Sequence, residues 1–185
     1  MANYYFAVLA IGRDTPGIVA GITGVLAEQH SCNMETSQMM TLGGHFALVM
    51  IVSSQLPVDP EKLQNDLAGS GGVDSDMHVH IGPIAPEDFR LVGGTEPSHR
   101  IFAVATDQSG LVHGMARVLS EASVNIGYLA SQRHEVSPEP QCQIAMDVSL
   151  PGEMNEDALR NRLNAALPKG SELIIESARQ RDGKS

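Results

Sequence analysis

The 185 residues are enough for one domain of ordinary size, or for two domains of roughly 90 residues each. Apolar residues make up 42% of the chain and charged residues 18%, a composition that excludes wholesale disorder. Aspartate and glutamate number 22 against 12 lysine and arginine residues, and the resulting charge of -10 opposes polyphosphate, so we expect no direct nucleic acid binding.

The first half of the chain predicts six elements in the order β-α-β-β-α-β. In chain order these are a strand at residues 4–11, a helix at 14–28, strands at 34–41 and 46–52, a helix from residue 60, and a strand at 73–82. The glycine pair Gly43-Gly44 indicates a hairpin between the two middle strands. Asp59 and Pro60 are typical of the cap and first position of a helix.

The second half predicts the same six elements. They are a strand at residues 101–105, a helix at 107–121, strands at 126–135 and 143–150, a helix that starts at Asn155, and a strand at 172–178. The stretch between the halves is rich in proline and glycine, which is typical of a linker. We expect domains at residues 1–83 and 99–180, a linker at 84–98, and a frayed tail from residue 179.

The two halves are repeats of each other. A constant offset of 93 places Asp14 on Asp107, Gly17 on Gly110 and Glu28 on Glu121, and the apolar stripe of each first helix coincides as well. The order of elements predicts an α+β fold, with two ferredoxin-like βαββαβ domains in tandem and helices on one face of each antiparallel sheet.

Several residues also have plain structural interpretations. Asp14 and Asp107 stand just before a helix, where aspartate is typical of an N-cap, although contact with a ligand amine can accompany that role. Gly21 and Gly114 indicate close packing of each first helix against a neighbour. The cysteines, Cys32 and Cys142, form no CxxC pair, so we expect buried free thiols.

The turn and the strand that follows the helix resemble the amino-acid-binding ACT domain. The matching pattern is Asp-x-x-Gly, a helix that runs to Leu-x-Glu, and an asparagine soon afterwards, and the first copy with DTPGIVAGI matches better. The whole layout, with NMETSQMM in the first repeat and NIGYLASQR in the second, resembles the glycine cleavage system transcriptional repressor family. The first repeat is also similar to the N-terminal domain of formyltetrahydrofolate deformylases.

This resemblance implies a site for a small amino acid, with glycine or serine favoured. The ligand-binding residues it implies are Asp14, Thr15, Pro16, Gly17, Ile18, Asn33 and Met34 in the first repeat, and Asp107, Gly110, Leu111, Asn125 and Ile126 in the second. A helix N-terminus suits a carboxylate, glycine permits close approach, and an asparagine amide both donates and accepts. The spacing from turn glycine to asparagine is 16 residues in the first repeat and 15 in the second, so the two sites need not be equivalent.

The resemblance therefore favours a regulatory sensor that acts on a partner such as a transcription regulator. The alternative is a free-standing regulatory subunit of an amino-acid or folate enzyme. The chain carries no catalytic motif that we recognise, and we expect no enzyme activity, cofactor or metal site. We see neither a membrane span nor a signal peptide and expect a cytoplasmic protein. Residues 46–52 are apolar at every position, which predicts that both faces of that strand are covered and that the chain forms a homodimer.

Overall fold

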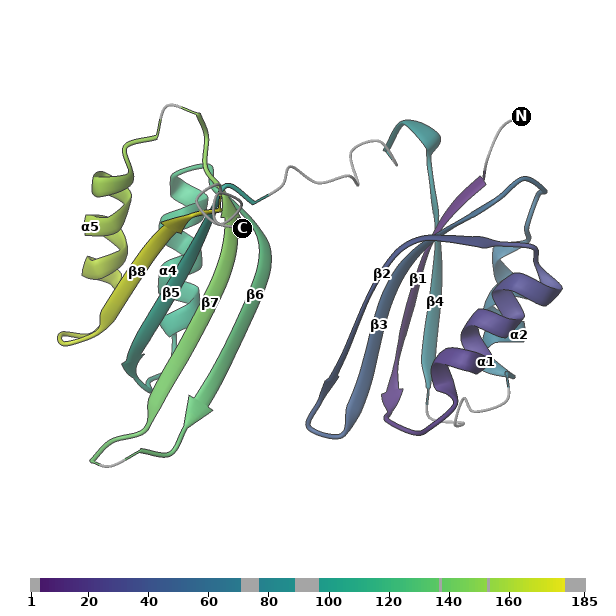
Figure 1. Ribbon diagram of the computed structural model, residues 1–185, viewed down its shortest axis with the longest axis horizontal. Coiled ribbons are helices and arrows are strands. Elements are labelled where there is room, and N and C mark those ends of the chain that lie inside the picture. The colour runs from purple at the N-terminus through teal and green to yellow at the C-terminus, as the bar shows by residue number, and fades with distance from the viewer. Residues whose placement is uncertain (1–3, 71–76, 89–96, 137, 153, 179–185) are drawn as a thin grey trace, which may run out of the picture. The chain divides into compact units, whose positions relative to one another are not determined.

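The computed structural model of the chain describes residues 4–70, 77–88, 97–136, 138–152 and 154–178 (Figure 1). The chain divides into two compact units, residues 1–93 and 94–185. Each unit contains a four-stranded antiparallel sheet with helices, which confirms the predicted fold class. Most of the predicted linker, the start of the strand predicted at 73–82 and the tail from 179 lie outside the described residues, and the predicted domain limits stay predictions.

The first unit has the strand order β2-β3-β1-β4. Its elements are β1 (Tyr4–Arg13), α1 (Ile18–Gly24), η1 (Val25–Gln29), β2 (Asn33–Leu42), β3 (His45–Ser54), α2 (Pro60–Ala68) and β4 (His78–Ile84). Gly43 and Gly44 both take positive φ, at 59° and 78°, and form the predicted hairpin turn. The Asp59 carboxylate accepts a hydrogen bond from the Glu61 amide, which confirms the predicted cap of α2.

The second unit repeats this plan with the strand order β6-β7-β5-β8. Its elements are β5 (His99–Thr106), α4 (Leu111–Glu121), β6 (Asn125–His134), β7 (Gln141–Ser149), α5 (Glu156–Ala166) and β8 (Glu172–Ser177). The Asn155 side chain caps α5 by accepting from the Ala158 amide, as its place in the sequence predicts. No helix in the described part of the chain is long and apolar enough to cross a bilayer.

Each unit has its own hydrophobic core between the sheet and its two helices, which cover one face of the sheet (Figure 1). The first core contains Phe46 and Met50 of β3, and the second contains Ile144 and Met146 of β7; all four side chains are 2% exposed or less. Burial of this kind contributes about 1.5 to 3 kcal/mol for each large apolar side chain. Both units can therefore hold their sheets and helices together through their own side chains.

The face of each sheet that points away from the helices is here called the outer face. On the first sheet it carries apolar side chains that are accessible within the unit: Leu9 is 42% exposed, Ile11 53% and Val49 51%. The strand predicted at residues 46–52 is thus covered by helices on one side only, and its cover on the other side stays a prediction.

The first helix of the first unit ends differently from its counterpart. In the second unit α4 is α-helical throughout, whereas α1 widens into the π-helical turn η1 before the chain reaches Ser31. Ser31 and Ser123 are matching residues with positive φ, 50° and 55°. The extra residue between Gly17 and Asn33 is therefore accommodated inside the helix, because a π turn holds one residue more than an α turn.

Candidate functional site

The turn before the first helix has the same backbone in both units. Gly17 is the N-cap of α1 with φ 100°, and Gly110 is the N-cap of α4 with φ 93°. Neither helix has a side-chain cap, so the prediction that Asp14 and Asp107 cap these helices is wrong. A glycine in the left-handed region takes the N-cap position instead, because other side chains rarely adopt that conformation. The aspartates lie three residues earlier and are free for other contacts.

In the first unit the turn is tied to the β2–β3 hairpin. The Asp14 amide donates to the Gly44 carbonyl at 3.0 Å. Its carboxylate accepts a long hydrogen bond of 3.4 Å from the Thr41 hydroxyl. These two hydrogen bonds tie the turn to the hairpin, and the negative charge of Asp14 has no cationic partner among the described residues.

In the second unit the corresponding carboxylate is paired with an arginine. The Asp107 amide donates to the Pro140 carbonyl at 2.8 Å, as its counterpart does to Gly44. The carboxylate, however, pairs with the Arg133 guanidinium at 2.8 Å, and the same guanidinium pairs with Glu135 at 2.8 Å. Arg133 holds the position on β6 that Thr41 holds on β2, since Arg133 pairs with Cys142 and Thr41 with Phe46 in matching registers. The two turns thus share a backbone and differ in charge.

The hydrophobic residue after each turn glycine belongs to the core. Ile18 is 2% exposed and Leu111 is 4% exposed, so these residues can offer a ligand only their backbone amides. Those amides lie in the first helical turn, where N–H groups have no acceptor within the helix. Thr15 is half-buried and Pro16 is exposed. The accessible part of the turn therefore presents backbone donors and, in the first unit, one carboxylate.

The asparagines lie at the other end of each sheet. Asn33 begins β2 and pairs with Ser53, whereas the turn follows Arg13, which pairs with His45 at the opposite end of β3. The eight steps from Tyr5, which also pairs with Ser53, to Arg13 span about 26 Å of strand. A single unit therefore does not bring its turn and its asparagine together.

The strand starts around the asparagines are irregular in both units. The β2–β3 register shifts between Met34 and Thr36, and the β6–β7 register shifts between Ile126 and Tyr128, as expected of a β-bulge. Asn33, Met34 and Asn125 are exposed, and Ile126 is partly buried against the second core. Both asparagine amides are accessible to a ligand or to another protein unit.

Sequence reasoning missed the partners of the turn carboxylates. Arg133 and Thr41 matter because they lie opposite the turn at the hairpin end of the sheet. Thr41 and Arg133 lie on the strand just before each hairpin loop, so the position of that loop would have placed them near the turn. The sequence pattern does not fix the length of the loop between β6 and β7, and the position of Arg133 could therefore not be predicted.

The cysteines are free and buried, as predicted. Burial raises the pKa of the Cys32 thiol and of the Cys142 thiol, and the nearby Asp107 charge adds to the effect at Cys142. A raised pKa keeps a thiol protonated and unreactive. Both side chains therefore act as core residues, and Cys142 lies on the side of the second core near Asp107.

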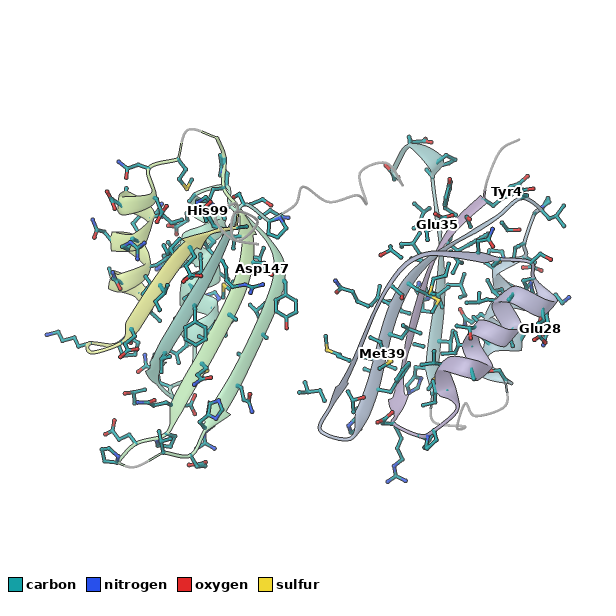
Figure 2. All side chains as sticks on the ribbon, in the orientation of Figure 1. Tyr4, Glu28, Glu35, Met39, His99 and Asp147 are labelled. Atoms are coloured by element: carbon teal, nitrogen blue, oxygen red, sulfur yellow. The ribbon has the colours of Figure 1, made fainter. Side chains whose placement is uncertain are left out.

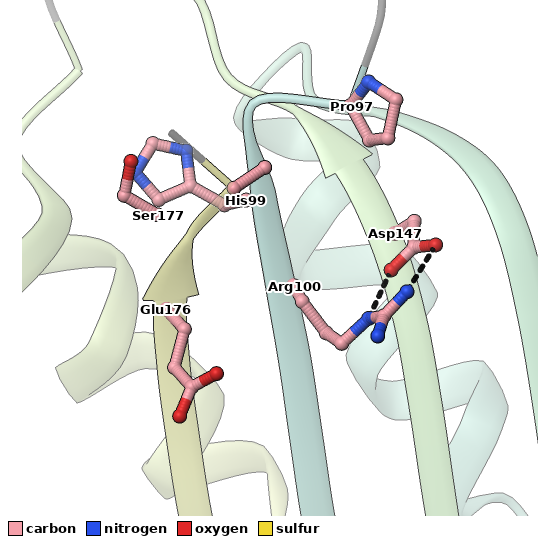
Figure 3. A pocket seen from close by; sticks show the side chains of 7 residues that line it. Pro97, His99, Arg100, Asp147, Glu176 and Ser177 are labelled. Carbon is pink, nitrogen blue, oxygen red and sulfur yellow. Dashed lines mark hydrogen bonds and ion pairs between the residues drawn. The ribbon is translucent and has the colours of Figure 1, made fainter. Parts of the chain in front are cut away.

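The outer face of the second sheet carries a charged row that the first sheet lacks. Glu176, Arg100 and Asp147 lie side by side on β8, β5 and β7 and line a hollow of about 320 Å³ (Figure 3). Arg100 donates to both carboxylate oxygens of Asp147, at 2.6 and 2.9 Å, and these bonds lower the pKa of Asp147. The matching register positions of the first sheet hold uncharged residues: Gly82, Ala7 and Ile51.

The chain is similar to several known proteins. A family model described as ACT domain matches residues 5–80. A UPF0237 protein of Methanopyrus kandleri is 46% identical over 71 residues, which are 36% of this chain and 78% of that protein. A UPF0237 protein of Listeria monocytogenes is 35% identical over 72 residues, 38% of this chain and 79% of that protein.

Two crystal structures are similar in fold across both units. One is a protein from Galdieria sulphuraria, 20% identical, with a TM-score of 0.75 over 96% of this chain and 99% of that chain. The other is a proposed glycine cleavage system transcriptional repressor, also 20% identical, with a TM-score of 0.69 over the same shares of the two chains.

Proposed function

The chain belongs to the ACT domain family, and from this premise we propose that it is a non-enzymatic regulatory protein that binds a small amino acid, glycine or serine, and controls a partner protein. The partner we propose is a transcription regulator of glycine cleavage, in line with the resemblance of the whole layout to that repressor family. The observation that carries the proposal is the turn of the first unit. It combines a left-handed glycine N-cap with an aspartate that has no cationic partner among the described residues.

The chemistry of this turn suits a zwitterion. The amides of the first turn of α1 can donate to an α-carboxylate, and the Asp14 carboxylate can accept from an α-ammonium group. Gly17 has no Cβ, so a ligand can approach its backbone closely. These groups can bind and orient a zwitterionic ligand, which supports the function of a sensor.

We place the asparagine contact in a second copy of the chain. β2 lies at the end of the sheet order, and all ten of its residues are exposed. When two such edge strands pair antiparallel, the start of one lies beside the end of the other. Asn33 of the second copy then approaches the end of the sheet where Gly17 lies, and the site is completed by the homodimer.

The direct test is to add glycine, serine or leucine to the full chain and to measure binding by calorimetry and by the shift of the thermal unfolding temperature. A ligand of the native state at 100 times its dissociation constant adds about 2.7 kcal/mol to the free energy of unfolding. We expect a raised melting temperature with glycine or serine and a smaller effect with leucine, whose side chain needs more room. A melt that neither glycine nor serine shifts at millimolar concentration contradicts the proposal.

The homodimer is tested separately by light scattering at micromolar concentration, with and without glycine. We expect the mass of a dimer that is favoured by ligand, since a site shared between copies links binding to association. A monomeric mass at saturating ligand contradicts the shared site and leaves the turn as a site within one copy.

A further inference from the structure

The two helices of the second unit are joined by an ion pair across their interface. Arg162 of α5 donates to Glu121 of α4 at 2.6 Å, and Arg117 of α4 reaches the same carboxylate at 3.2 Å. A Cβ added to Gly114 would lie 3.4 Å from the Ala166 carbonyl oxygen, so the helices approach closely there. In this unit α4 and α5 thus lie in close contact, and the Glu121 carboxylate at their interface is paired with arginine.

The first unit has an open groove in the same place. It lies between α1, η1 and α2 and has a volume of about 560 Å³. Its lining includes Gly21, Gly24, Glu28, Asn65, Asp66 and Ser70. A Cβ added to Gly24 would meet nothing within 4 Å, which confirms that this part of the groove is empty.

Alignment of the two units shows which side chains of the second unit have no counterpart in the groove of the first. The buried pairs Leu63 with Leu67 and Leu159 with Leu163 align α2 with α5, and this alignment places Asp66 where the second unit has Arg162. The offset of 93 places Gly24 on Arg117 and Glu28 on Glu121. The glutamate is therefore present in both units, whereas both of its arginine partners are absent from the first.

The charges left in the groove are negative. Glu28 is exposed at the end of the first helix (Figure 2) and has no hydrogen bond or ion pair among the described residues. Asp66 accepts a hydrogen bond of 2.9 Å from His30 through Oδ2, and its side chain is 30% exposed. Two carboxylates thus face a hollow that is large enough for a side chain and holds no basic residue in its lining.

We propose that this groove is a docking surface for a partner protein that inserts an arginine between Glu28 and Asp66. The arginine would restore from outside the contact that Arg162 and Glu121 make within the second unit. A guanidinium fits better than an ammonium because its planar fork can bond two carboxylates at once. The groove repels phosphate, so the occupant is a basic protein segment and not a nucleic acid.

This inference deepens the proposed function, since it names a surface through which a regulated partner can be recognised. It does not use the turn at Gly17, which begins the helix whose other end carries Glu28. The two ideas can therefore fail independently of each other.

The test is an NMR titration of the full-length, ¹⁵N-labelled chain with a capped six-residue peptide that contains two arginines and otherwise alanine. The control peptide has citrulline, which is uncharged and nearly the same shape, in both arginine positions. We expect the arginine peptide to move the amide signals of residues 20–29 and 65–70, and the citrulline peptide to leave them in place. Shifts spread evenly over the acidic surface, or equal shifts with citrulline, overturn the proposal.

Variants sharpen this result. Glu28→Gln and Asp66→Asn should each weaken the arginine peptide about ten-fold, the effect of one lost charge-assisted bond. Gly24→Arg rebuilds the pair that Arg117 makes with Glu121 and should abolish binding, while the matched Gly24→Ala should retain it. Glu121→Gln in the second unit should change nothing. Unchanged affinity in both Glu28→Gln and Gly24→Arg overturns the proposal, and glycine binding by Glu28→Gln, measured in parallel, reports on the turn alone.

Discussion

The second unit has three ion pairs whose arginines are absent from the first unit, and at two of these places the first unit keeps the carboxylate, Asp14 or Glu28. The ion pairs are Arg133 with Asp107, Arg162 with Glu121, and Arg100 with Asp147. The matching positions of the first unit hold no basic residue: Thr41, Asp66 and Ala7. The comparison indicates that one copy of the repeat keeps its charge available for ligands and partners, whereas the other uses arginine to satisfy the same surface.

The largest expected effect comes from Gly17→Val. A β-branched residue at φ 100° is strained, and its side chain covers the amides that would bind a carboxylate. We expect complete loss of glycine binding in calorimetry. Gly110→Val should cost similar stability, about 1 to 3 kcal/mol, and leave affinity unchanged. Equal loss of binding in both variants would show that the two turns are equivalent after all.

Asn33→Ala should come next. The loss of one hydrogen bond to a charged ligand is worth roughly 1.5 to 3 kcal/mol, so the affinity for glycine should fall by about one to two orders of magnitude. Asn125→Ala is the matched control and should bind normally. Because both asparagines are exposed, neither change should alter the melting temperature without ligand. Normal affinity in Asn33→Ala contradicts the shared site.

Thr41→Arg transfers the charge pattern of the second unit to the first. The new guanidinium can pair with Asp14 as Arg133 pairs with Asp107, so the carboxylate is less available to an ammonium group. We expect affinity to fall about ten-fold or less by calorimetry. Thr41→Val, which removes only the hydroxyl, should have a smaller effect. An affinity that rises in Thr41→Arg would rule out Asp14 as a ligand contact.

Gly24→Ala tests the open helix interface through stability. Alanine in a helix is about 1 kcal/mol more stable than glycine, and the added Cβ at this position meets nothing within 4 Å. We expect the free energy of unfolding in urea to rise by roughly 0.5 to 1 kcal/mol. Gly114→Ala should gain less, because its Cβ meets the Ala166 carbonyl oxygen at 3.4 Å. A larger gain at Gly114 would contradict the difference in helix packing.

The smallest expected effect concerns the charged row. Arg100 lowers the pKa of Asp147, so this carboxylate stabilises the folded chain above its unfolded pKa and loses that contribution as pH falls through its lower, folded-state pKa. Arg100→Ala with Asp147→Ile copies the first unit and should cost at most about 1 kcal/mol near pH 7, since Arg100 is half exposed. Thermal melts should show this difference beginning to shrink as the pH falls below about 4. A difference that grows in acid has the wrong sign for an ion pair.

The fold could be predicted from the sequence because its signals are local and occur twice. The glycine pair at the hairpin, the Asp59 cap and the apolar helix stripes each specify a short segment. The helix stripes and the cap have counterparts in the second repeat, where Asn155 is the cap, whereas the glycine pair occurs in the first repeat alone. The N-cap prediction for Asp14 was wrong because an aspartate shortly before a helix can either cap the helix or lie in the preceding turn and bond to a neighbouring segment. Only the backbone angle of Gly17 decides between them.

The candidate site could be predicted only as a set of residues. Gly17 and Asn33 belong to one sequence motif but lie at opposite ends of the sheet, about one strand length apart. The sequence does not show this separation, because it depends on how β2 and β3 pair with β1. The ion pairs of Arg133 and Arg162 were likewise hidden, because each joins residues from different elements. The two units therefore differ in how many of their carboxylates remain unpaired, and this difference depends on tertiary ion pairs as well as on composition.

The π turn η1 has a consequence for how the two repeats can diverge in length. The Cys32 amide reaches back to the Leu26 carbonyl, whereas the Val124 amide reaches Leu119, one residue less, and both chains then enter their next strand in the same way. A wide helical turn thus absorbs a one-residue insertion before it can shift a strand register, in which a slip would turn every side chain to the other face. Deleting Gln29 should convert η1 to an ordinary α-helical end and leave the β2–β3 pairing unchanged. The helix end is therefore one place where this architecture tolerates gain or loss of a residue while the strand pairing that follows stays the same.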